Sequence, residues 1–82
     1  MLHKFSGRYS CLRLERCDRE RRMARFYTMH SAPTLFGGWD LVREWDRIDS
    51  PGTLRITPFE TLEDSERALR RIEKQKRKRG YL

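Results

Sequence analysis

Residues 39–57 read WDLVREWDRIDSPGTLRIT, two alternating segments joined by a proline and a glycine. In the first segment, residues 39–48, a period of two places five side chains on one side of a strand: Trp39, Leu41, Arg43, Trp45 and Arg47. Pro51-Gly52 predicts a type II turn over residues 50–53, because proline presets φ at the first central position and glycine supplies a positive φ at the second. The segment therefore predicts a hairpin whose second strand covers residues 53–57 and is closed by Pro58.

Two further strands are predicted before this hairpin. In residues 9–17, Leu12 and Leu14 alternate with charged residues, as in a half-buried strand. The charged loop 18–22 separates this strand from a second one over residues 23–31, whose packing residues are Phe26, Tyr27 and Met29. Residues 32–38 (APTLFGG) predict a structured connection that tucks Leu35 and Phe36 inward.

A helix is predicted after the fourth strand. Thr61 is its expected N-cap, and Asp64 follows three residues later. A narrow apolar stripe at helical spacing consists of Leu62, Ser65, Ala68, Leu69 and Ile72. The cationic run 74–79 extends the helix and Gly80 ends it. The expected fold is α+β: a small antiparallel sheet of about four strands with one C-terminal helix packed on it. Residues 1–8 are expected to be frayed, and residues 9–82 to form one domain.

The positive charge is concentrated at one end of the chain. Residues 1–66 hold eleven Lys or Arg and eleven Asp or Glu, whereas residues 67–82 hold eight cations and Glu73 alone, which accounts for the net charge of +7. Such an asymmetry is typical of proteins that bind nucleic acid or another acidic surface. No run of about 20 apolar residues suggests a membrane span, and we expect a cytoplasmic protein that does not bind membranes.

Several kinds of chemistry are not indicated. In one strand, Cys11 and Cys17 would lie about 20 Å apart, too far for a disulfide, and reduced thiols suit the cytoplasm. With His3 and His30, these cysteines match no zinc spacing, and a buried thiol or two with surface histidines is expected instead. The chain has no phosphate-binding loop and no nucleophile with a well-placed histidine and acid. We therefore predict neither an enzyme nor a metal or cofactor site.

Two features could bind a partner. The basic end of the helix could neutralise phosphates, through Arg70, Lys74, Lys76, Arg77, Lys78 and Arg79, with Arg67 and Arg71 before them; the alternative is a solvated helix end. On the third strand, Arg43, Trp45 and Arg47 could stack on a base or sugar and pair with the flanking phosphates. Alternatively, Trp45 is a core residue and the arginines pair with Glu44 or Asp46.

The segment 25–81 resembles the WGR domain, which is named for a Trp-Gly-Arg signature and occurs in poly(ADP-ribose) polymerases and in bacterial proteins. The matching positions are Phe26-Tyr27, residues 33–39 (PTLFGGW), residues 42–48 (VREWDRI), Ser50–Thr53 (SPGT), Phe59 and residues 76–81 (KRKRGY). This chain is most similar to the short bacterial members. It differs in having Asp46 at the central position of the signature and Asp49 where a further glycine is usual.

The resemblance implies a fold and a role. The family fold is an antiparallel sheet with a helix packed on it. In the polymerases the domain binds DNA break ends, its tryptophan stacks against a terminal nucleotide sugar, and its arginine joins DNA to neighbouring domains. By this resemblance Trp45 would be the stacking residue and Arg47 the adjoining cation. We expect a monomeric, non-catalytic domain that binds nucleic acid, with DNA favoured. The alternative is a protein-interaction module in which Asp46 and Asp49 form an acidic rim and DNA binding is absent or weakened.

Overall fold

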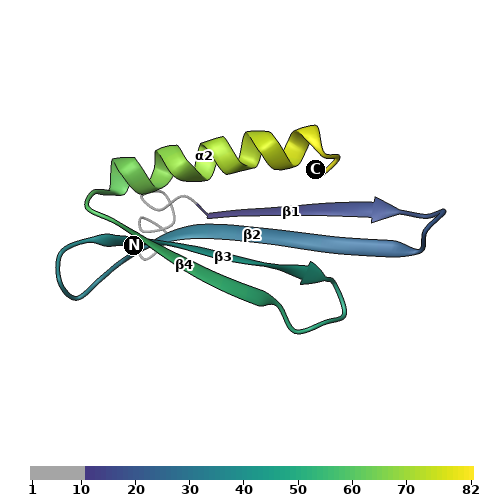
Figure 1. The fold of residues 1–82 in the computed structure, drawn as a ribbon, viewed down its shortest axis with the longest axis horizontal. Helices are drawn as coiled ribbons and strands as arrows, with labels where there is room; N and C mark the ends of the chain where they lie inside the picture. The colour runs from purple at the N-terminus through teal and green to yellow at the C-terminus, as the bar shows by residue number, and fades with distance from the viewer. Residues whose placement is uncertain (1–10) are drawn as a thin grey trace, which may run out of the picture.

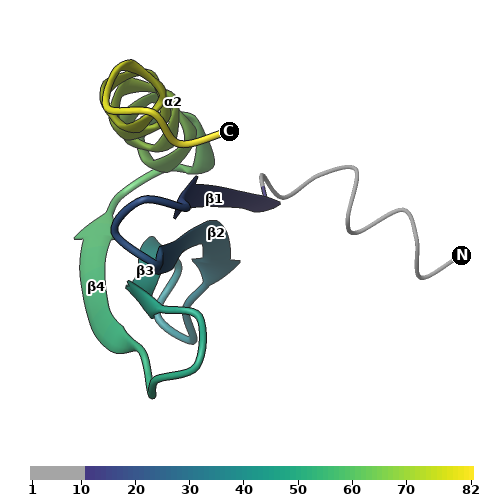
Figure 2. The same ribbon diagram turned by 90° about the vertical axis from the view of Figure 1, so that its right-hand side faces the viewer.

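The computed structural model describes residues 11–82 and confirms the α+β prediction (Figure 1). Four strands precede one helix: β1 (Cys11–Asp18), β2 (Met23–Pro33), β3 (Trp39–Arg47), β4 (Thr53–Phe59) and α2 (Leu62–Lys78). The strands pair antiparallel in the order β1-β2-β3-β4, so each strand neighbours the one that follows it in the chain. The sheet is strongly twisted, and α2 lies across one of its faces (Figure 2). Residues 1–10, which include those expected to be frayed, lie outside the described part.

The register shows which side chains share the face that α2 covers. Leu14 pairs with Tyr27 and Tyr27 with Trp45, while Ser31 pairs with Leu41. Residues directly opposite each other in a ladder point to the same side, so alternate residues of all four strands face the helix. The five residues that the alternation of β3 predicts to share a face therefore do so.

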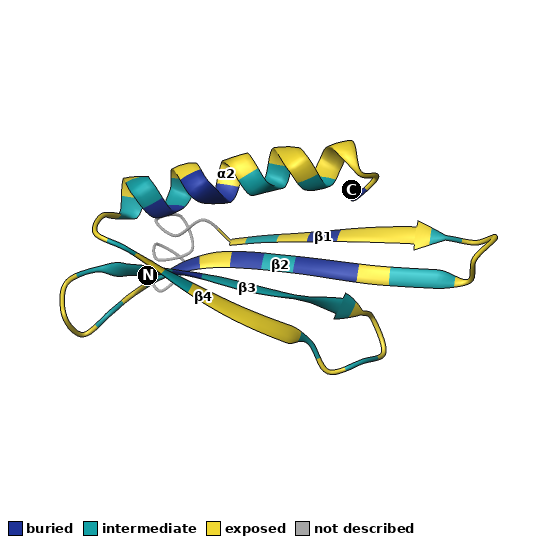
Figure 3. Ribbon diagram, in the orientation of Figure 1, coloured by how far each residue is buried: buried dark blue, intermediate teal, exposed yellow. Residues whose placement is uncertain are grey.

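The core lies between this face and the helix (Figure 3). Its buried residues come from the sheet, the helix and the segment after the helix: Leu14, Tyr27, Met29, Leu41, Ala68, Leu69 and Tyr81. Ser65, at the centre of the helical stripe, is fully buried, and its hydroxyl hydrogen-bonds that of Ser31 at 2.7 Å. This bond offsets the cost of burying two hydroxyl groups. The predicted helical stripe is the face that packs on the sheet.

Both ends of α2 are capped. The Thr61 hydroxyl accepts a hydrogen bond from the Asp64 amide at 3.1 Å, as the N-cap prediction requires. At the other end Gly80 has φ of 100°, its amide donates to Arg77, and the Tyr81 amide donates to Lys76. These two bonds form a Schellman motif, in which glycine adopts the left-handed conformation. The motif turns the chain back so that Tyr81 enters the core and Leu82 exchanges two backbone hydrogen bonds with Glu15 of β1.

Two turn predictions are wrong. Gly52 does not have a positive φ, so the β3–β4 connection is not a type II turn; a bond from the Ser50 amide to the Arg47 carbonyl closes a turn instead. Leu35 and Phe36 are each 97% exposed rather than tucked inward. They occupy the centre of a tight turn that is closed by bonds between Thr34 and the two glycines that follow, Gly37 and Gly38.

Smaller differences concern strand ends and thiols. β2 and β4 are each two residues longer than predicted, and β4 includes Pro58, which an edge strand tolerates because one side of its backbone is unpaired. Cys11 and Cys17 are free, but both are exposed, contrary to the expectation of a buried thiol. The reason is that they occupy positions of β1 that face away from the helix.

Candidate nucleic-acid interface

Trp45 lies on the helix-covered side of β3, directly opposite Tyr27 of β2. The two rings are stacked, with centroids 5.5 Å apart and planes inclined by 15°. Tyr81 meets the Tyr27 ring edge-on at 6.2 Å. Trp45 is half-buried and packs against the core without being enclosed by it. The tryptophan thus has one supported ring face and part of its surface left in solvent, which is an arrangement suited to stacking.

Arg43 shares this face and contacts the aromatic rings. Its guanidinium lies 6.0 Å from the centre of the Trp45 ring, and Nη1 donates to the Tyr27 hydroxyl at 3.4 Å. Its Nε atom is buried and has no hydrogen-bond partner within residues 11–82. Glu44 and Asp46, the acids considered as partners for the arginines, occupy the alternate positions of β3 and face the other way.

Lys76, in the last turn of α2, contacts the rings, and Arg79, the C-cap residue, lies near Lys76. The Lys76 ammonium lies 4.6 Å from the centre of the Tyr27 ring and 5.9 Å from that of Tyr81. Burial lowers the pKa of Lys76, and the neighbouring charges of Arg79 and Arg43 lower it further. Neither these two arginines nor Lys76 forms an ion pair with a carboxylate in the described part of the chain. We call Arg43, Lys76 and Arg79 the cation cluster.

A row of arginines crosses the sheet beside Trp45. Arg16 of β1 pairs with Arg25 of β2, which pairs with Arg47 of β3, so three like charges stand side by side. All three are exposed and lack an ion-pair partner within residues 11–82. Like charges directly opposite each other destabilise a sheet. The row is therefore a cost to the sheet that no ion pair within residues 11–82 offsets.

The other predicted helix cations do not join this surface. Arg70, Lys74 and Lys78 repeat every four residues and form an exposed stripe on the outer side of α2, away from Ser65 and Leu69. Arg77 is bound to Glu73 by a 2.9 Å ion pair. Arg67 is bound to Asp64 by a 3.1 Å ion pair, and Arg71 is exposed. Of the cations at the helix end, Lys76 contacts the rings and is close enough to Arg43 for their charges to interact, and Arg79 lies near Lys76.

Four residues of this surface are not predicted from the sequence: Tyr27 and Tyr81 as supports for Trp45, and Arg16 and Arg25 as neighbours of Arg47. The sequence does contain a signal for these arginines. Arg16 is two residues from Leu14 and Arg25 is two residues from Tyr27, so each arginine points to the same side of its strand as that core residue. Among residues 11–82 no three metal-binding side chains come together, and no helix is long and apolar enough to span a membrane.

Comparison with known proteins gives a consistent result. The family model of the WGR domain matches residues 10–82. The chain is 44% identical over 70 residues to the uncharacterised protein y4dW of Sinorhizobium fredii, a match that covers 85% of this chain and 34% of that protein. The matched part of this chain therefore spans about a third of the curated relative. No solved structure is significantly similar to this chain.

Proposed function

The chain belongs to the WGR domain family, and from that premise we propose that it binds nucleic acid, DNA in preference, without catalysing a reaction. One observation carries the proposal: a half-buried tryptophan, stacked on Tyr27, lies among cations that no carboxylate of residues 11–82 neutralises. An aromatic ring next to unpaired guanidinium groups suits a nucleotide, whose base or sugar stacks while its phosphates accept charge-assisted hydrogen bonds.

In this proposal each group has a separate role. Trp45 stacks on a base or sugar, as the family resemblance implies. Arg47 and the two arginines in its row contact one phosphate stretch, and the cation cluster contacts another. The outer stripe of α2, together with Arg77, adds contacts that depend on charge and not on sequence.

Asp46 does not oppose this proposal, because its strand position faces away from Trp45. Its carboxylate accepts hydrogen bonds from the Arg47 amide at 2.9 Å and from the Thr53 hydroxyl at 3.4 Å. The Asp46 carboxylate is thus engaged in hydrogen bonds that hold the β3–β4 hairpin. This weakens the part of the alternative that assigns Asp46 to an acidic rim, whereas Asp49, the other residue of that rim, is exposed.

A matched pair of charge variants tests the proposal. Arg47→Gln removes one cation beside Trp45, whereas Arg13→Gln removes one from the opposite face of the sheet. With a nicked duplex at about 0.15 M salt, we expect Arg47→Gln to weaken binding by about 1.5–3 kcal/mol, the range of a hydrogen bond to a charged group. Arg13→Gln should stay within about twofold of wild type, a change that screening of a distant charge permits. Fluorescence anisotropy measures both affinities, and an equal loss of affinity in the two variants would contradict the assigned face.

A further inference from the structure

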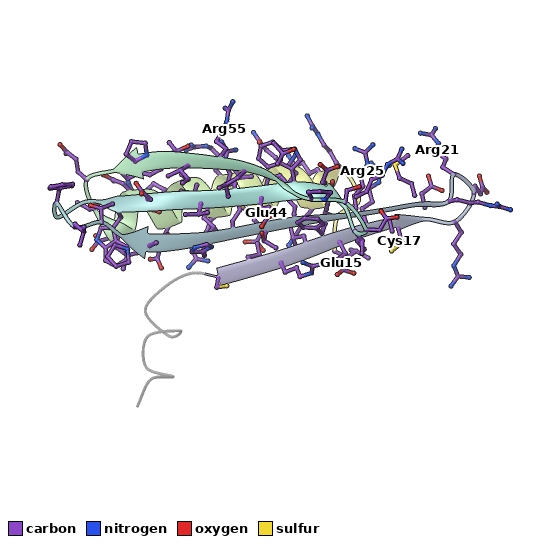
Figure 4. All side chains as sticks on the ribbon, turned by 90° about the horizontal axis from the view of Figure 1, so that it is seen from below. Glu15, Cys17, Arg21, Arg25, Glu44 and Arg55 are labelled. Carbon is purple, nitrogen blue, oxygen red and sulfur yellow. The ribbon has the colours of Figure 1, made fainter. Side chains whose placement is uncertain are left out.

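The sheet face opposite α2 combines apolar and acidic side chains (Figure 4). On β4 the residues with this orientation include Leu54, 60% exposed, and Ile56, 53% exposed. Leu54 is directly opposite Glu44 and Ile56 is opposite Val42, with Asp40 two residues along β3. We call Asp40, Val42, Glu44, Leu54 and Ile56 the open face. The helix of the described chain packs on the other side (Figure 2).

The two sides of the sheet carry opposite charge. On the side away from α2 the strands present one arginine, Arg13, against four carboxylates, which belong to Glu15, Asp40, Glu44 and Asp46. On the helix side they present one carboxylate, Asp18, against five arginines, which are Arg16, Arg25, Arg43, Arg47 and Arg55. A nucleic acid attracted to the helix side is repelled by the open face.

Two of the four carboxylates are available for a partner. Glu15 is bound to Arg13 at 2.9 Å, and Asp46 holds the β3–β4 hairpin. Asp40 and Glu44 form no ion pair within residues 11–82. They flank Val42 on β3, so two negative charges border the apolar strip formed with Leu54 and Ile56. Apolar area edged by like charges is the pattern of a surface that recognises apolar residues accompanied by the opposite charge.

We propose that the open face docks a basic amphipathic segment of a partner protein. Apolar side chains of the segment pack on Val42, Leu54 and Ile56, while its lysines or arginines pair with Asp40 and Glu44. Because the two sides of the sheet are separate, the chain holds this segment and a nucleic acid at the same time. The proposal goes beyond nucleic-acid binding and does not depend on it.

Two synthetic helical peptides test the proposal. Both carry leucine on one side; the polar side carries lysine in the first peptide and glutamate in the second. The net charge of +7 by itself favours the glutamate peptide everywhere on the molecule. We nevertheless expect the lysine peptide to shift the amide NMR signals of Val42, Leu54 and Ile56 in the full chain. The glutamate peptide should instead shift those of Lys76 and Arg79.

A pair of variants locates the contact. Leu54→Thr removes an apolar side chain from the open face and should weaken lysine-peptide binding by about tenfold. Leu35→Thr makes the same change at the exposed β2–β3 turn and should leave peptide binding unchanged. The Leu54→Thr variant should also bind the nicked duplex as tightly as wild type does. A failure of the peptide proposal can therefore be distinguished from a failure of the nucleic-acid proposal.

Several outcomes would overturn the proposal. One is that the lysine peptide shifts no amide signal of the open face. Another is that the lysine peptide binds the Leu54→Thr and Leu35→Thr variants with equal affinity. A third is a concentration-dependent dimer, seen by sedimentation without peptide and abolished by Leu54→Thr, because the occupant would then be a second copy of the chain.

Discussion

Lys76 holds an ammonium group against two tyrosine rings and close to two guanidinium groups. Contact with the ring faces favours the charged form, yet the pKa of Lys76 is lowered from 10.5. Burial and the neighbouring charges of Arg79 and Arg43 thus outweigh the attraction of the rings. A cation kept in this position at a cost to stability is what a phosphate-binding role would require.

Lys76→Met tests that cost through its pH dependence. The folded pKa lies below the unfolded value of 10.5, so between the two the unfolded chain binds more protons and stability rises with pH. The penalty is fully present below the folded pKa. We therefore expect the stability difference between Lys76→Met and wild type, measured by urea unfolding, to shift steadily in favour of wild type as pH approaches 10.5. Lys74→Met, on the exposed stripe, is the control for replacing one lysine of α2 with methionine.

At this scale the sequence predicts part of the candidate interface. The alternation of β3 is enough to group Arg43, Trp45 and Arg47. It does not group Arg16 and Arg25 with them, because that requires the hairpin register, which a shift of one residue would invert. Tyr81 is equally unpredictable, since it reaches Tyr27 only through the reversal of the chain at Gly80.

The β3–β4 hairpin depends on a glycine for space, not for a positive φ. A Cβ at position 52 would overlap the Glu44 side chain, including its Cγ, which cannot move as freely as the carboxylate. We expect Gly52→Ala to lower the free energy of unfolding by about 1–2 kcal/mol through this overlap. Glu44→Ala should cost little alone and should remove most of the Gly52→Ala destabilisation in the double variant. Urea unfolding of all four chains checks this; additive effects would contradict it.

The elements themselves are the part of the fold that the sequence predicts best. Both ends of α2 follow from Thr61 and Gly80, whose capping chemistry is local. The β2–β3 and β3–β4 turns are harder to predict. Pro51-Gly52 is compatible with a type II turn, but glycine is needed at position 52 because the Glu44 side chain lies there, which the local sequence does not reveal. The apolar character of Leu35 and Phe36 favours an inward position, but both lie in a tight turn, where they are 97% exposed with respect to residues 11–82.

Across residues 11–82, the charged side chains of the sheet are sorted by side, and the outer stripe of α2 adds to the positive charge. The variant carrying Arg70→Gln, Lys74→Gln and Lys78→Gln tests what that stripe contributes. We expect it to weaken binding to blunt, nicked and single-stranded oligonucleotides to a similar degree, because phosphate contacts carry no structural information. The slope of log affinity against log salt should become shallower by about 0.9 for each duplex phosphate that the variant no longer neutralises.

The matching control at this scale is Glu66→Gln, which changes the charge of α2 without removing a cation. It should leave the salt slope unchanged. A triple variant that alters the ranking of the three oligonucleotides would contradict a purely charge-based role for the stripe, since the ranking is expected to come from Trp45 and its neighbours.

The chain reversal at Gly80 ties the helix end to the sheet. Loosening of the last turn of α2 would withdraw the Tyr81 ring from beneath Lys76 and break the two backbone bonds between Leu82 and Glu15. Residues after a final helix usually exchange their amide protons rapidly, whereas here the Leu82 amide is held by β1. Its protection against exchange would therefore report on the integrity of the aromatic platform itself.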